Sequence, residues 1–220
     1  MSTLSTVSTV RSAPVRGVIF DFGGVLLRWQ PEEIIARFYA EEALRTLLRE
    51  SVLKHADWIE IDRGTFSEEA AIERFAARMG RPPEEMRRLM RHIEDSLIPM
   101  TDTLDIVSDL VRRGVPVYGL SNMAAWIFAA LERRYTHWGQ FRGIVISGEV
   151  KLIKPDPQIF HLIAGRYGLV PAETLFIDDH LPNIDCARRL GFRTIHFSDA
   201  RQCARELDPH LPPAPRTPGA

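Results

Sequence analysis

The stretch Val18–Leu26 most constrains how this chain can fold, because an apolar run leads into one carboxylate and then into two glycines. The β-branched and aromatic residues before Asp21 are typical of a buried strand. The pair Gly23–Gly24 allows the backbone to approach a bound group closely. Ligands of open α/β sheets bind beyond the carboxyl ends of the strands, so Asp21 is a candidate functional residue. Taken alone, the pattern is more typical of an aspartate in a turn or at a helix cap.

Strands and helices alternate along the second half of the chain. With a first strand at 15–21, the sequence predicts strands over 115–120, 143–146, 174–178 and 194–197. It predicts a helix that ends at Gly114 and helices over 124–134, 157–167 and 182–190. Such alternation predicts an α/β fold, a Rossmann-like parallel sheet core covered by helices on both faces.

A block between the first strand and this alternation has a helical pattern and no convincing strand. Helix starts are indicated at Pro31, Ser67 and Pro83, each followed by two acidic residues. We interpret the block as an α-helical cap inserted into the core. The expected division is a core of 15–30 and 96–200, a cap of 31–95, and disordered tails at 1–14 and 208–220.

The composition of the chain makes nucleic acid and membranes poor candidates as binding partners. A chain of 220 residues with 45% hydrophobic residues suits one large domain or a core with an insertion. Its net charge of −1 argues against nucleic acid or an anionic membrane as a partner. Cys186 and Cys203 have no metal-binding or redox spacing, and no apolar run approaches the length of a membrane span. We therefore expect a cytoplasmic protein; the oligomeric state stays open.

Polar residues follow the predicted strands in a regular order: Asp21, Ser121–Asn122, Lys154 and Asp178–Asp179. In a parallel sheet with right-handed crossovers, residues just past the strand ends gather along one edge. Each group also has a structural interpretation, with Ser121 or the paired acids as helix caps and Lys154 as a solvated lysine. Two adjacent acids would repel each other unless a cation lay beside them.

These residues give the chain a resemblance to a known family. It resembles the haloacid dehalogenase-like hydrolase superfamily, most of whose members are phosphatases, through four segments: Phe20–Val25, Leu120–Asn122, Lys154–Pro155 and Phe176–Ile184. Asp62–Gly64, followed by Ser67, is also similar to the cap of a subgroup that includes sugar-1-phosphate phosphatases and the phosphatase domain of soluble epoxide hydrolases.

The resemblance implies a Mg²⁺-dependent phosphatase that hydrolyses a small phosphorylated metabolite, with sugar phosphates as one candidate. Asp21 would be the nucleophile and form an aspartyl-phosphate, with Lys154 supplying fixed positive charge. Ser121, Asn122 and Lys154 would bind the phosphate. The metal ligands would be Asp21, Asp179 and the carbonyl of Gly23, with Asp178 contributing directly or through water.

One position departs from the family pattern. Most phosphatases of the superfamily have a second Asp two residues after the nucleophile, as general acid and base, where this chain has Gly23. General acid-base help contributes about two to four orders of magnitude in rate. We expect low activity, a substituting group such as His180 or His137, or a substrate with an acidic leaving group, as in sugar-1-phosphates.

Two other functions remain open. A haloacid dehalogenase would use Asp21 to displace halide from carbon, but it needs no metal and no paired acids, so Asp178–Asp179 favours a phosphatase. A phosphate-binding or interaction protein with little turnover is also compatible with Gly23. In either case the cap would control access, and Trp29, Trp58 and Phe66 are candidates to line its inner face.

Overall fold

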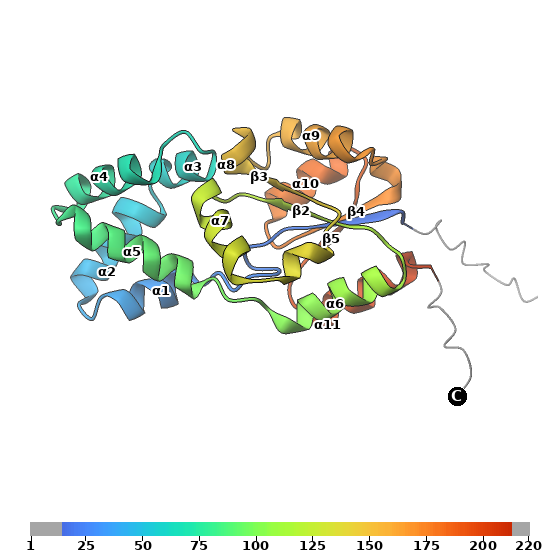
Figure 1. Cartoon of the computed structure of the whole chain (residues 1–220), viewed down its shortest axis with the longest axis horizontal. Coiled ribbons are helices and arrows are strands. Elements are labelled where there is room, and N and C mark those ends of the chain that lie inside the picture. Colours follow the sequence, from blue (N-terminus) through green and yellow to red (C-terminus); the bar gives the residue numbers. More distant parts are fainter. Residues whose placement is uncertain (1–14, 213–220) are drawn as a thin grey trace, which may run out of the picture.

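The computed structural model describes residues 15–212, with a five-stranded sheet at the centre of the core (Figure 1). The strand order is β3-β2-β1-β4-β5, and all neighbouring pairs are parallel. The bounds are β1 Gly17–Phe20, β2 Val117–Ser121, β3 Gly143–Ile146, β4 Thr174–Asp178 and β5 Arg193–His196. This sheet confirms the predicted α/β fold with a Rossmann-like core.

The topology places Asp21 at the centre of one sheet edge. Strand β1 lies between β2 and β4, and the strand order reverses beside it, which is where open α/β sheets bind ligands. Phe20 pairs with Ile177 of β4, so the next residues, Asp21 and Asp178, come level with each other. The Asp21 amide N–H also donates to the Ile177 carbonyl oxygen at 2.9 Å, which extends the ladder by one residue.

Both faces of the sheet are covered, and β1 is buried along its whole length. Val18 and Phe20 join a hydrophobic cluster with side chains of α6, α7 and α11, whereas Ile19 joins a second cluster with side chains of α9 and α10. This alternation follows from the two-residue period of a strand. The helices span α6 Thr101–Arg112, α7 Ala125–Arg134, α9 Pro157–Tyr167, α10 Leu181–Arg189 and α11 Ala200–Leu207.

The regular elements between β1 and α6 are all helices, and they project beyond the sheet at the left of Figure 1. Ser67 caps α4 by accepting a hydrogen bond from the Ala70 N–H, and Gly80 ends it with φ of 62°. The bounds are α1 Pro31–Phe38, α2 Glu42–Leu48, the π-helical turn η1 Arg49–Leu53, α3 Ala56–Asp62, α4 Glu68–Met79 and α5 Pro83–Ser96. The helix starts expected at Pro31, Ser67 and Pro83 agree with these bounds.

Two chain segments join this helical unit to the core, and they lie side by side. The Arg28 N–H donates to the Ile98 carbonyl oxygen, and the Met100 N–H donates to the Leu26 carbonyl oxygen, each at 2.8 Å. These contacts support the proposed division into a core and a cap, with boundaries next to Pro31 and Ser96.

Some elements were not expected from the sequence. The short helix α8 (Ser147–Val150) and α11 were missed, as were the 3₁₀ turns η2 His137–Gln140, η3 Pro171–Glu173 and η4 Asp208–His210. The expected tail at 208–220 begins too early, because the Val15 N–H donates to the His210 carbonyl oxygen at 2.9 Å and Leu211 is buried. Residues 1–14 and 213–220 lie outside the described part of the chain.

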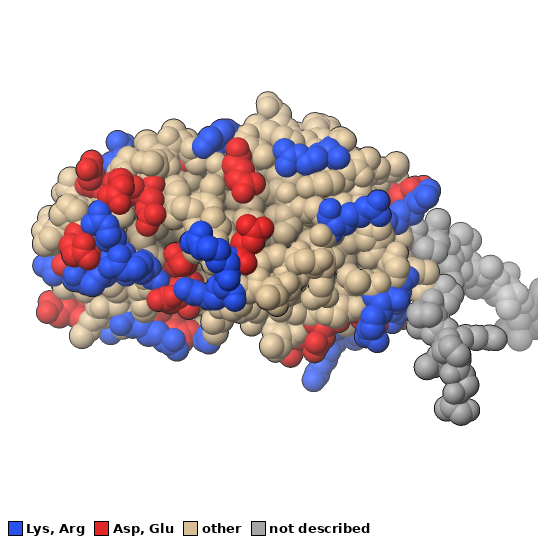
Figure 2. All heavy atoms as spheres, in the orientation of Figure 1, with Lys and Arg blue, Asp and Glu red and all other residues tan. Residues whose placement is uncertain are grey.

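Charged side chains of both signs gather most densely over the cap on the face seen in Figure 2, and they are interspersed rather than segregated. Among residues 15–212, no helix combines the length and the apolar character that crossing a bilayer would require.

Candidate active site

Asp21 stands where β1 ends, at the carboxyl edge of the sheet. Only 11% of its side chain is exposed. Its Oδ1 accepts hydrogen bonds from the Phe22 N–H at 2.6 Å and from the Lys154 ammonium at 2.8 Å. The carboxylate is therefore held in one orientation, as an attacking group requires.

The ammonium of Lys154 is fully buried and lies between two carboxylates, 2.8 Å from Asp21 Oδ1 and 2.7 Å from Asp178 Oδ2. Asn122 fixes the lysine backbone: its Oδ1 accepts from the Lys154 N–H at 2.8 Å, and its Nδ2 donates to the Lys154 carbonyl oxygen at 2.9 Å. The side-chain amide of Asn122 thus uses one donor and one acceptor on the lysine backbone.

Asp178 ends β4, Asp179 follows it, and the two have different surroundings. Asp178 is buried and accepts hydrogen bonds from the His180 N–H at 2.8 Å and from the side chain of Asn183 at 3.0 and 3.1 Å. Asp179 is exposed and packs against Gly24 so closely that a Cβ there would lie 2.2 Å from its Oδ2. Gly24 also has φ of 75°, so this position requires glycine.

The charges of these groups shift one another's pKa values. Burial, and then repulsion from Asp178, raises the pKa of Asp21 well above its ordinary value, although Lys154 opposes the shift. Burial also acts to raise the pKa of Asp178, but the Lys154 ammonium outweighs it and the pKa is lowered. Burial, and then the charge of Asp178, raises the pKa of Asp179. The lysine pKa is raised by its two carboxylates despite burial, so its charge persists.

The donor set fits a divalent cation. One oxygen each from Asp21, Asp178 and Asp179 lies within 4.8 Å of the others. One ammonium faces these three carboxylates, which leaves an excess of negative charge. Hard cations such as Mg²⁺ take carboxylate and carbonyl oxygens, so the residues present suit this ion.

Ser121 ends β2 and is buried next to this cluster in the sheet. The structure thus brings Asp21, Lys154 and the paired acids together, with Ser121 and Asn122 on the neighbouring strand end. Sequence reasoning missed Asn183, which holds Asp178 from the first turns of α10. Its place five residues after a strand-terminal aspartate is too weak a signal by itself.

The two histidines expected as substitutes for the missing acid differ in position. His180 donates its backbone N–H to Asp178, and its imidazole acts electrostatically on Asp179, whose pKa it tends to lower. His137 stacks against Tyr135 and packs on Trp138, with ring centroids 5.7 and 4.1 Å apart, respectively. His137 thus belongs to an aromatic cluster and not to the site.

A cavity of about 100 Å³ opens between the cap and the carboxyl edge of the sheet. Trp29 and Trp58, stacked with ring centroids 6.0 Å apart, form part of its wall. Phe66, also expected on the inner face of the cap, does not line it and instead lies under the Arg74 guanidinium. The lining consists of Gly23, Trp29, Trp58, Asp62, Ile93, Leu97, Asn122, Met123 and Ile127. It is predominantly apolar.

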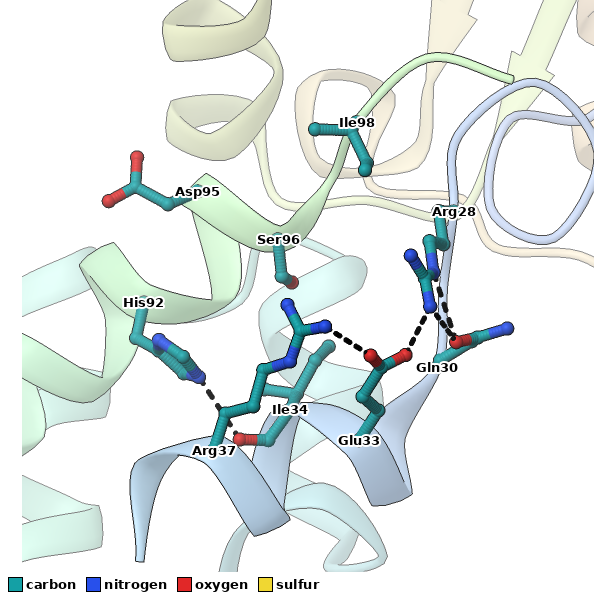
Figure 3. A pocket seen from close by; sticks show the side chains of 9 residues that line it. All are labelled: Arg28, Gln30, Glu33, Ile34, Arg37, His92, Asp95, Ser96 and Ile98. Carbon is teal, nitrogen blue, oxygen red and sulfur yellow. Dashed lines mark hydrogen bonds and ion pairs between the residues drawn. The ribbon is translucent and has the colours of Figure 1, made fainter. Parts of the chain in front are cut away.

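A second cavity, of about 320 Å³, lies between α1 and α5 beside the segments that join cap and core (Figure 3). Arg28 and Arg37 both point toward Glu33 and pair with its carboxylate (Figure 3). None of the residues predicted for the active site lines this cavity. Its cations are engaged within the wall, and it is separate from the carboxylate cluster.

With this geometry, comparisons with known proteins define the family. Residues 15–191 match the model of the haloacid dehalogenase-like hydrolases, and the chain belongs to that family. This confirms the predicted family and the prediction of a hydrolase.

Individual proteins give a finer comparison. The chain is 27% identical over 192 residues to the sesquiterpene phosphatase astK of Aspergillus oryzae, which covers 87% of this chain and 94% of that protein. It also matches parts of two longer proteins. The match spans 36% of the drimenol cyclase drtB of Aspergillus calidoustus and 19% of acyl-CoA dehydrogenase family member 10 of Mus musculus.

Solved structures share the fold. A Bacteroides thetaiotaomicron enzyme of the family, in complex with magnesium and inorganic phosphate, has a TM-score of 0.69 at 24% identity, with 82% of this chain and 93% of that chain covered. The L-2-haloacid dehalogenase of Xanthobacter autotrophicus has a TM-score of 0.63 at 21% identity, with 88% and 82% covered.

Proposed function

We propose that this chain is a Mg²⁺-dependent phosphatase that transfers the phosphoryl group of a small phosphate monoester to Asp21 and then to water. The observation that carries the proposal is the buried Lys154 ammonium, which bridges the nucleophile Asp21 and Asp178 at 2.8 and 2.7 Å. A nucleophilic carboxylate and a phosphate repel each other, so the site needs fixed positive charge. Lys154 would supply that charge beside the Asp21 carboxylate.

The metal site follows from the same cluster. Asp21, Asp179 and the Gly23 carbonyl would hold Mg²⁺, with Asp178 directly or through water. When bound, the ion would supply Lewis-acid charge that draws phosphate and Asp21 together. The acids at 178 and 179 favour this function over dehalogenation, which requires no cation.

The other polar groups would bind the phosphate. The Ser121 hydroxyl and the Asn122 backbone N–H would donate to phosphoryl oxygens as negative charge moves during transfer. The side-chain amide of Asn122 would keep Lys154 in place through its two hydrogen bonds to the lysine backbone.

The cavity favours a substrate with an apolar body. Its wall contains two tryptophans and four aliphatic or thioether side chains, and neither Lys nor Arg is among its lining residues. A sugar would find few hydrogen-bond partners there, because most of the lining is apolar and the Asn122 amide already uses one donor and one acceptor on Lys154. The similarity to a sesquiterpene phosphatase is consistent with this, and we place terpenoid phosphates ahead of sugar phosphates.

The test is phosphate release from geranyl phosphate, glucose 1-phosphate and 4-nitrophenyl phosphate, with Mg²⁺ or with a chelator. Release should require Mg²⁺, and Asp21→Asn should lower it by about 10³-fold or more. The matched control Asp102→Asn changes an exposed aspartate of α6 and should leave the rate unchanged. Chloride release from 2-chloropropionate in chelator would instead identify a dehalogenase. Phosphate binding without release, unaltered by Asp21→Asn, would identify a binding protein.

A further inference from the structure

Gly23 occupies the position at which most phosphatases of this family carry the general acid. It has no side chain, but there is room for one. A Cβ added at Gly23 would have only Trp29 within 4 Å among the residues away from its chain neighbours, at 3.8 Å. Gly23 lines the cavity of about 100 Å³ between the cap and the sheet edge. Another residue that lines this cavity is therefore a candidate for the acid that protonates the leaving group.

Asp62 is the one ionisable side chain among the residues that line this cavity. It is the last residue of α3, and it lines the same mainly apolar cavity as Gly23 and Asn122. The backbone N–H of Ala124, two residues after Asn122, donates to its carboxyl group. Asp62 thus reaches from the cap to the core loop that follows β2.

The cap is fastened to the core at this point, so the carboxyl group has a defined place. The Ser147 hydroxyl donates to the Asp62 carbonyl oxygen at 2.5 Å, and the Lys151 ammonium donates to the Gly64 carbonyl oxygen. Gly64 has φ of 75°, and a Cβ there would lie 2.2 Å from the Gly148 carbonyl oxygen. The turn after α3 therefore packs directly on α8.

The surroundings of Asp62 suit proton transfer. Loss of hydration raises the pKa of its carboxyl group to about 7, and no charged side chain contributes to that shift. Both the acid and the carboxylate are then populated near neutral pH, as a group that alternates between acid and base requires. A carboxyl group can accept the Ala124 N–H with one oxygen and donate its proton from the other.

We propose that Asp62 replaces the missing second aspartate as the general acid and base, an inference that rests on the proposed phosphatase function. In the first half-reaction Asp21 attacks phosphorus, the bond to the leaving oxygen breaks, and the Asp62 proton moves to that oxygen to give the alcohol. In the second, the Asp62 carboxylate takes a proton from water as the water oxygen attacks phosphorus. The bond to Asp21 breaks, inorganic phosphate leaves, and Asp62 is protonated again.

The test compares leaving groups. Asp62→Asn should lower kcat/KM for geranyl phosphate, whose alcohol leaves poorly, by about 10²-fold or more, since that is the range of general acid catalysis. It should change kcat/KM for 4-nitrophenyl phosphate little, because this phenolate leaves without a proton. The ratio kcat/KM reports only the first half-reaction, so the later role as base does not confuse the result.

Two control variants separate chemistry from structure. Glu60→Gln changes a carboxyl on the same helix that does not line the cavity, and it should affect neither substrate. Ser147→Ala removes a hydrogen bond at the same cap–core contact, and it should lower kcat/KM for both substrates by the same factor. If Asp62→Asn does not fold, Asp62→Ser is measured in the same way.

Rescue gives a second readout. Gly23→Asp in the Asp62→Asn background should restore turnover of the alkyl ester, because it returns an acid to the position that lacks one. An equal loss for both esters, without rescue, would show that Asp62 only fastens the cap, and the phosphatase proposal would stand. An unaltered protein that releases phosphate from neither ester would refute the phosphatase proposal itself.

Discussion

Replacing Lys154 by Met removes the one ammonium that the carboxylate cluster contains and leaves Asp21 and Asp178 buried beside each other. Breaking a buried ion pair by removing one partner costs about 3–5 kcal/mol, because the other charge stays desolvated. The free energy of unfolding should fall by about that amount at pH 7 without divalent cations. This corresponds to roughly two to four orders of magnitude in the folding equilibrium.

The matched control is Lys54→Met, the same substitution in an exposed pair. The Lys54 ammonium lies 3.1 Å from Glu50 four residues earlier, and the two side chains are 62% and 59% exposed. Exposed helical pairs of this kind contribute only about 0.3–0.5 kcal/mol. Urea unfolding followed by circular dichroism, with a chelator present, measures both variants against the unaltered protein.

The pH dependence has a definite sign. Lys154 lowers the pKa values of Asp21 and Asp178, so its loss raises both in the folded state. A folded-state pKa above the unfolded value means that the folded protein binds more protons, so the variant's stability falls as pH rises above the unfolded pKa. The deficit of Lys154→Met should therefore be smaller at pH 5 than at pH 8. A cost no greater than that of Lys54→Met, or one independent of pH, would refute the reasoning.

Three further predictions concern the same edge of the sheet. Gly23→Asp alone should change kcat/KM for alkyl phosphates by less than about tenfold in phosphate-release assays, because Asp62 already supplies the acid and a Cβ at position 23 meets Trp29 only at ordinary contact distance. A rise of about tenfold or more would show that the unaltered site lacks an effective general acid. Asp21→Asn should stabilise the metal-free protein at pH 8, and less so toward pH 4, because the raised pKa of Asp21 makes its ionised form unfavourable; urea unfolding at both pH values tests this. Gly24→Ala should destabilise by about 1–3 kcal/mol and weaken Mg²⁺ binding in calorimetry, since φ is 75° and the new Cβ would overlap Asp179. Unchanged stability and affinity would show that the backbone relaxes at little cost.

The fold could be anticipated because its signals are local. The apolar run before Asp21 and the later alternation of strands and helices are patterns of neighbouring residues, and β4 and α9 lie where the sequence predicts them. Short elements were missed because their patterns are too brief. Helix α11, for example, is eight residues long and begins at the cap Asp199, whose side chain accepts the Gln202 N–H.

Part of the site follows from topology alone. Once the sheet is parallel, residues past the strand ends must meet at one edge, so Asp21 and Asp178 could be paired before any distance was known. Which side chains hold them could not be foreseen in the same way. The sequence predicted a role in phosphate binding for the backbone N–H of Asn122, but it gave no sign that the side-chain amide of Asn122 would hydrogen-bond the backbone of Lys154.

The sequence by itself therefore determined the α/β class, the order of the candidate catalytic groups and the absence of an acid at Gly23, because each depends on residues close together along the chain. Only the tertiary structure decided that Asp62 of the cap lines the same mainly apolar cavity as Gly23 and that the pKa of Asp62 rises to about 7. Those two facts depend on how the cap packs on the core, which brings together residues far apart in the chain and removes the water around them.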